Sequence, residues 1–192
     1  MLPYDFEYLG PHHRVTRLLK QHCLEDVVAA GTTDLEKFAL LRDWVHSQWL
    51  GWQAPQYPFC PSWDPLEILD TTKGNWGFGM CTHYGAVFAG CASALGYVAR
   101  VLVVNHHCLA EVWSDELGKW ILQDAGPNRE YDATYEHRGI PVNALEFHRM
   151  HEAGTAHAEL LWPLLPWLAA ARNGANSPIP SIISETPFCI RF

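Results

Sequence analysis

Residues 79–96 read GMCTHYGAVFAGCASALG, and this stretch predicts a helix that begins at or next to Cys81 and ends at Gly96. Its apolar residues recur at helical spacing on one face, and the residues around them are small. Small side chains let neighbouring backbone approach closely. We therefore expect a buried central helix.

Cys81 is the first candidate for chemistry in this stretch. A helix N-terminus stabilises a thiolate, because its free N–H groups and the helix dipole favour an anion. The glycine-rich approach, residues 73–80, leaves room for a substrate carbonyl near backbone donors. The alternative is a buried structural cysteine, which is the usual fate of a lone Cys.

The chain after the helix predicts an antiparallel sheet. Residues 98–105 and 107–113 are β-branched and apolar runs, residues 114–118 predict a turn, and residues 120–123 form a third run. Helices followed by a meander of strands indicate an α+β domain, with the central helix packed on the sheet.

His107 begins the second of these strands. Side chains alternate along a strand, so His107 and Glu111 share one face while His106 points to the other. His107 is therefore the main candidate for a base and His106 the lesser one. The alternative for either is a partly exposed histidine without a catalytic role.

Asp124 stands where the next strand ends. A carboxylate bonded to one imidazole nitrogen fixes the tautomer and leaves the other nitrogen to accept the thiol proton. An isolated Asp at a strand end is more often a turn former. Cys81, His107 and Asp124 together, in compatible local structure, favour a catalytic triad.

Asn75 and Trp76 lie in the glycine-rich approach and carry side-chain N–H donors. Acyl transfer needs a second donor beside the backbone N–H of the cysteine, because charge collects on the substrate oxygen. We expect Asn75 in this role and Trp76 as a wall for substrate stacking. The alternative for Asn75 is a plain turn residue beside Gly74.

The remaining segments are predicted from the spacing of apolar residues and from the positions of proline and glycine. Residues 12–30 and 33–50 predict helices, the proline-rich residues 51–65 an irregular connection, residues 125–141 a loop and residues 142–158 a helix. The stretch NGANSPIP, residues 173–180, indicates a linker, followed by a tail.

Four short segments of the sequence form a pattern: Gly79-Met-Cys81, Ala94-Leu-Gly-Tyr-Val-Ala-Arg100, His107-Cys-Leu-Ala-Glu-Val112 and Trp120-Ile-Leu-Gln-Asp124. In order and spacing they resemble the core motif of the transglutaminase-like superfamily. The helix from Thr33 to Val45 is similar to the one that precedes the core in that family. The resemblance covers residues 32–124.

The resemblance implies a papain-like α+β core with Cys81, His107 and Asp124 as the triad, and Arg100 and Glu111 as supporting residues. The chain departs from the family pattern at Leu109, where an aromatic is usual, and in the longer approach to Cys81. We expect a helical segment over residues 1–31, the catalytic core over 32–125, an extension of the same domain over 126–172 and a linker or tail over 173–192.

The function implied is that of a cysteine-dependent hydrolase or acyltransferase of the protease, amidase or transglutaminase type, acting on a peptide, protein or glycopeptide. Animal transglutaminases need calcium, and this sequence neither requires nor excludes it. The alternative is a catalytically silent module on the same fold that binds a peptide or glycan.

Composition excludes several other classes. The formal charge is −8 and no basic stripe is present, so nucleic acid is not an expected partner. We expect a soluble chain, since it has neither a signal-peptide pattern nor an apolar run long enough to span a membrane. The six cysteines include no CxxC pair, and His148-x-x-His151 is a chance pair among 11 histidines, so we predict no metal site, no cofactor and mostly free thiols.

Overall fold

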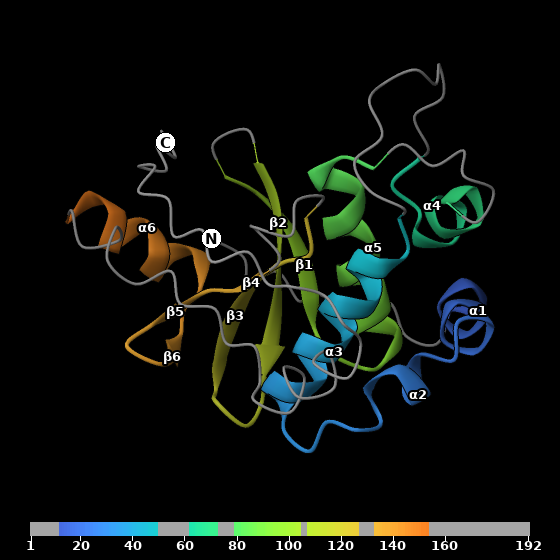
Figure 1. The fold of residues 1–192 in the computed structure, drawn as a ribbon, viewed down its shortest axis with the longest axis horizontal. Helices are drawn as coiled ribbons and strands as arrows, with labels where there is room; N and C mark the ends of the chain where they lie inside the picture. Colours follow the sequence, from blue (N-terminus) through green and yellow to red (C-terminus); the bar gives the residue numbers. More distant parts are fainter. Residues whose placement is uncertain (1–11, 50–61, 73–78, 105–106, 127–132, 154–192) are drawn as a thin grey trace, which may run out of the picture.

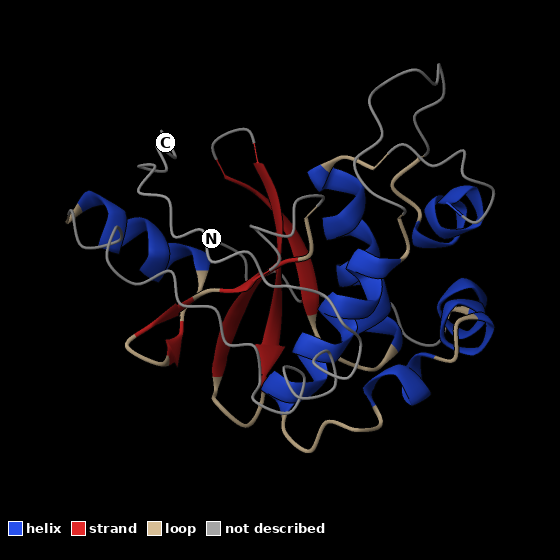
Figure 2. Cartoon of the chain, in the orientation of Figure 1, coloured by secondary structure: helices blue, strands red, loops and turns tan. Residues whose placement is uncertain are grey.

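A computed structural model of the chain describes residues 12–49, 62–72, 79–104, 107–126 and 133–153. An antiparallel sheet has helices on both sides: α3 and α5 lie against one face with α1, α2 and α4 outside them, and α6 lies on the other side (Figures 1 and 2). Each face has its own buried apolar cluster. The predicted α+β class is confirmed.

The N-terminal part contains two short helices, α1 (His13–Gln21) and α2 (Leu24–Val28). The single helix expected over residues 12–30 is wrong, because Cys23 adopts a left-handed conformation with φ of 49° and interrupts it. A non-glycine residue seldom adopts this conformation, so nothing in the sequence marked the break. Leu18, Leu24 and Val28 still reach the same core.

Helix α3 (Asp34–Ser47) begins at a capping box in which Thr33 and Glu36 bond each other's backbone N–H groups. It ends at Ser47, slightly before the expected end near residue 50. Most of the proline-rich connection lies outside the described residues. Pro65 begins helix α4 (Pro65–Thr72), as suits a residue without an N–H group at the first helical position.

Helix α5 (Cys81–Ala94) is the centre of the domain, as its small residues predicted. It contacts β1, β2 and the helices α1, α3 and α4. Gly90 lies directly against the ring of Pro65, so that even a single methyl group at Gly90 would overlap the ring. Gly96, with φ of 93°, reverses the chain after the helix.

The main sheet has the order β1-β2-β3-β4 and is antiparallel throughout. Its strands are β1 (Ala99–Val104), β2 (His107–Ser114), β3 (Lys119–Asp124) and β4 (Ala133–Thr134). The predicted meander is confirmed. Ala110 and Val112 of β2 face α5, whereas Leu109 belongs to the cluster on the opposite face.

Residues 125–141 are not only a loop, as we expected. They include β4 and a small hairpin of β5 (Glu136–His137) and β6 (Ile140–Pro141). Helix α6 (Ala144–Glu152) follows and packs through Phe147 on the second apolar cluster. None of the helices in the described ranges is long and apolar enough to cross a bilayer.

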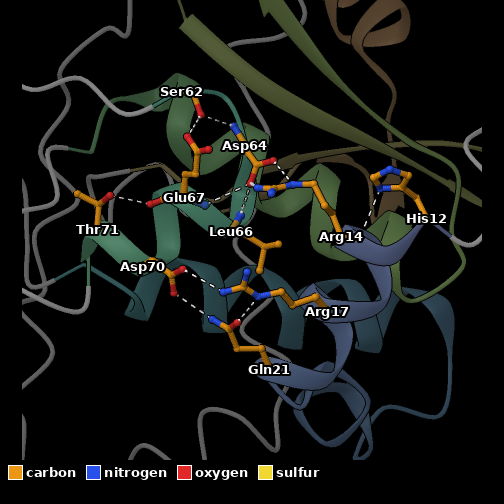
Figure 3. Close-up of polar contacts among 10 residues, drawn as sticks. All are labelled: His12, Arg14, Arg17, Gln21, Ser62, Asp64, Leu66, Glu67, Asp70 and Thr71. Atoms are coloured by element: carbon orange, nitrogen blue, oxygen red, sulfur yellow. Dashed lines mark hydrogen bonds and ion pairs between the residues drawn. The ribbon is translucent and has the colours of Figure 1, made fainter.

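Polar contacts join α1 to α4, the last described helix before the approach to Cys81 (Figure 3). Arg14 lies 2.7 Å from Asp64, and Gln21 donates to Asp70 at 2.9 Å. Asp64 also accepts the N–H groups of Leu66 and Glu67 and so caps α4. Asp64 and Asp70 therefore each make a polar contact between the two helices.

Candidate active site

Cys81 is the first residue of α5, and its N–H belongs to the first turn, where helical N–H groups have no partner within the helix. The side chain is half-buried. Its sulfur interacts with the imidazole of His107, the backbone N–H of Cys108 and the hydroxyl of Thr82. The imidazole of His107 and the backbone N–H of Cys108 can each donate a hydrogen bond to a thiolate.

His107 and Asp124 meet across β2 and β3. Nε2 of His107 lies 2.7 Å from Oδ2 of Asp124, and the side chains are 35% and 2% exposed, respectively. With Nε2 on the carboxylate, Nδ1 is the ring nitrogen left for the sulfur of Cys81. The imidazole thus stands between a buried carboxylate and a thiol.

Electrostatics favours a thiolate and an imidazolium at this site. The hydrogen bond to His107 lowers the pKa of Cys81 to about 7, against the opposing effect of burial. Hydrogen bonds to Asp124 and Cys81 raise the pKa of His107 to about 10. A thiolate with a neighbouring imidazolium is the reactive form of a nucleophilic cysteine.

Asp124 has two further partners that the sequence did not reveal. Oδ1 accepts the backbone N–H of Gly126 at 2.9 Å, and Oδ2 accepts the hydroxyl of Tyr135 at 3.3 Å. A Cβ at Gly126 would lie 2.7 Å from Oδ1, so only glycine fits this close approach. In the sequence, the glycine two residues after Asp124 is the one feature that could have indicated this close contact with the carboxylate.

Arg100 and Glu111, predicted as supporting residues, pair with each other across β1 and β2 at 2.6 Å. The guanidinium also lies 4.2 Å from the ring centroid of Trp120. The other oxygen of Glu111 accepts the N–H of Ala144 at 2.6 Å, at the start of α6. These contacts join the sheet to α6 and do not reach Cys81.

Several predicted residues cannot be placed. Asn75, Trp76 and His106 lie outside the described residues. Among the described ones, His148 is 3.5 Å from Glu152 on the same helix. No group of three or more His, Cys, Asp or Glu side chains within these ranges is arranged to hold a metal ion.

The other described cysteines differ from Cys81 in their surroundings. Cys23, Cys91 and Cys108 are free thiols. Cys91 is fully buried in the main apolar cluster, and this burial raises its pKa far above the ordinary value. Cys108 accepts the hydroxyl of Thr82 at 3.2 Å, and burial raises its pKa as well. Cys81 is the thiol of this group whose environment favours the anion.

Comparison with protein families matches residues 21–125 to the core model of the transglutaminase-like superfamily. The match extends over more than half of the chain and includes all the residues of the Cys81, His107 and Asp124 cluster. Comparison with curated proteins and with solved structures finds no match.

Proposed function

The chain belongs to the transglutaminase-like superfamily, and on this premise we propose that it is a cysteine-dependent amide-bond hydrolase or acyltransferase. The observation that carries the proposal is the contact of one imidazole with both Cys81 and Asp124. The proposed substrate is a peptide, a protein or a glycopeptide, and no cofactor is part of the proposal.

In the proposed first half-reaction, the thiolate of Cys81 attacks the carbonyl carbon of an amide or ester. The imidazolium of His107 then gives its Nδ1 proton to the leaving group as the bond between the carbonyl carbon and the leaving group breaks. A thioester acyl-enzyme remains. Asp124 keeps the ring in place and stabilises its charged form through the 2.7 Å bond to Nε2.

In the second half-reaction, water or an amine attacks the thioester and His107 accepts its proton. The thiolate of Cys81 leaves and the site returns to its starting state. We propose water as the acceptor, which makes the enzyme a hydrolase. Transfer to an amine would follow the same steps with a different nucleophile.

Charge on the substrate oxygen needs donors, and the N–H of Cys81 is one of them in this proposal. We propose the amide of Asn75 as the second donor and Trp76 as a stacking wall. Asn75→Ala should then lower turnover by about 10²- to 10³-fold with little change in the Michaelis constant. Normal turnover of that variant would assign the second donor to another residue.

The test of the proposal uses Cys81→Ala and Cys81→Ser. Cys81→Ala should abolish release of product from peptide, glycopeptide and peptidoglycan substrates and keep the fold, whereas Cys91→Ala should keep the activity. Cys81→Ser should act as a substrate trap: incubated with extracts that contain peptides, glycopeptides or peptidoglycan, it should remain bound to its substrate. Activity of Cys81→Ala equal to the wild type would contradict the proposal.

The competing assignment, a silent module that binds a peptide or glycan, predicts a different result. Its Cys81 would react with iodoacetamide at about pH 6 no faster than an ordinary thiol. A reactive enzyme cysteine should instead be alkylated at that pH ahead of Cys23, an exposed thiol whose sulfur contacts the backbone carbonyl of Lys20. Peptide mapping of the alkylated protein separates the two assignments.

A further inference from the structure

We propose that Tyr135 is a positioning residue for this site, because its hydroxyl shares one carboxylate oxygen of Asp124 with His107. The distances to Oδ2 are 3.3 Å from the hydroxyl and 2.7 Å from Nε2 of His107. The inference rests on the proposed function, in which Asp124 orients the base.

Backbone hydrogen bonds to β3 and to Val142 hold Tyr135 next to Asp124. β4 pairs with the end of β3, with Ala133 opposite Asp124. The N–H of Tyr135 donates to the carbonyl of Leu122 at 3.4 Å, and its own carbonyl accepts the N–H of Val142 at 2.9 Å. The backbone of Tyr135 is therefore fixed relative to the strand that carries the carboxylate.

Packing fixes the ring as well. Tyr135 is 7% exposed and meets Phe147 of α6 edge to face, with the ring centroids 5.2 Å apart. Leu122 and Val142 belong to the same apolar cluster. Because the ring is enclosed in this way, its hydroxyl remains in one position at the carboxylate.

The hydrogen bonds of Asp124 show what the hydroxyl does. Asp124 is 2% exposed, and among the described residues Oδ1 accepts the N–H of Gly126 while Oδ2 meets the donors of Tyr135 and His107. The Tyr135 hydroxyl restrains rotation of the carboxylate. It also takes up part of the negative charge that Oδ2 would otherwise present to the imidazolium alone.

Removing the hydroxyl therefore has a definite electrostatic consequence. Oδ2 would hold the imidazolium more strongly, so the pKa of His107 would rise and its proton would be given up less readily. A residue with a purely structural role would change stability and leave this pKa where it is.

Other titratable or charged groups surround the pair, and Tyr135→Phe alters none of them chemically. Cys81 of α5 and Cys108 of β2 lie on the thiol side. From α3, His46 Nδ1 lies 2.9 Å from the carbonyl of Gly126, and Arg42, beside Asp43, donates to Thr134 at 2.7 Å. Glu136 of β5 is partly buried and lies within the electrostatic reach of Arg42.

The test is Tyr135→Phe, which removes only the hydroxyl and keeps the ring. The pKa of His107 is followed by NMR of histidine-labelled protein, with the His107 signal assigned by its absence from His107→Ala. We expect Tyr135→Phe to raise this pKa by about half a unit, the scale of one ordinary hydrogen bond. An unchanged or lowered pKa would overturn the inference.

Tyr97→Phe is the matched control. Its hydroxyl also donates to a carboxylate, Asp34, at 3.2 Å, but Asp34 bonds to Ser114 at the end of β2 opposite to His107. Tyr97→Phe should leave the His107 titration unchanged. A rise equal to that in Tyr135→Phe would show that the effect is not specific to Asp124, and the inference would fail.

A double variant tests whether the effect passes through the carboxylate. On an Asp124→Asn background, Tyr135→Phe should no longer raise the pKa of His107, since the shared charge is gone. A rise of the same size on both backgrounds would overturn the inference. The NMR titration requires no turnover, so failure of this inference can be told apart from failure of the proposed function, which shows itself when wild-type Cys81 is not rapidly alkylated.

Discussion

Nδ1 of His83 accepts the backbone N–H of Met80 at 3.0 Å, so a fully buried imidazole closes the first turn of the helix that Cys81 begins. The bond joins the residue before Cys81 to the second residue after it and so ties Met80 to the helix. Because Nδ1 is the acceptor in this bond, Nε2 is the ring nitrogen that carries a proton. His83 therefore fixes the backbone on which the nucleophile stands.

His83→Phe should separate this bond from the packing of the ring. Phe fills a similar space but offers no acceptor, so the variant should lose about 1 kcal/mol of stability, as other N-terminal caps do. Alkylation of Cys81 by iodoacetamide should slow as well, since the first turn is loosened. Urea unfolding and peptide mapping measure the two effects, and wild-type behaviour in both would show that the cap is unimportant.

His107→Ala should change the pH dependence of the Cys81 thiol. In the wild type the alkylation rate should rise as pH rises through about 7, because the imidazole favours the thiolate and lowers the thiol pKa. Without the imidazole the midpoint should move up toward the ordinary thiol value, with a roughly tenfold or greater loss of rate at neutral pH. A midpoint that stays near 7 would mean that His107 does not activate Cys81.

Gly79→Ala should disturb the approach to Cys81. A Cβ at Gly79 would lie 2.6 Å from Nε1 of Trp49 and 2.8 Å from the ring of Tyr84. These two rings are buried and stack at 3.9 Å, so neither can move easily. The expected cost is about 1–3 kcal/mol, the range for overpacked cores, measured by urea unfolding.

Gly85→Ala is the control for that variant, since Gly85 lies in the same helix as Cys81. A Cβ there would be 3.5 Å from the carbonyl oxygen of Leu109, an ordinary contact. Alanine is the better helix former, so this change should be neutral or stabilising by up to about 1 kcal/mol. Equal losses of stability in both variants would show that overlap with Trp49 and Tyr84 is not the cause of the effect at Gly79.

The central helix and the meander could be predicted because their signals are local. The small residues around Gly90 predict close packing, and Gly90 indeed lies against the ring of Pro65. The break at Cys23 could not be predicted, since a non-glycine residue seldom adopts the left-handed backbone that it has here. Strand β4 has two residues, too few to show an alternating pattern.

The same contrast applies to the site. Cys81, His107 and Asp124 each follow a local signal, a helix start or a strand end, and the structure brings them into contact. Tyr135 follows none, because it reaches Asp124 only through the pairing of β4 with β3. A partner set by long-range pairing has no mark in the sequence around it.

The last prediction compares one substitution at two aspartates. Asp34 is 7% exposed and accepts the hydroxyls of Ser114 at 2.7 Å and Tyr97 at 3.2 Å. Ser114 is fully buried, so Asp34→Ala would leave its hydroxyl without this acceptor. The expected loss is about 1–3 kcal/mol of unfolding free energy.

Asp70→Ala should behave differently, although Asp70 also has partners on another helix (Figure 3). Its side chain is 47% exposed and its contact with Arg17 is 3.7 Å long, so solvent screens the pair. Asp70 also lies in the last turns of α4, where the helix dipole disfavours a negative charge. The change should therefore cost less than about 1 kcal/mol, or even stabilise the protein. Urea midpoints of the two variants, measured side by side, give the comparison; a loss at Asp70 as large as that at Asp34 would show that burial does not separate the two carboxylates.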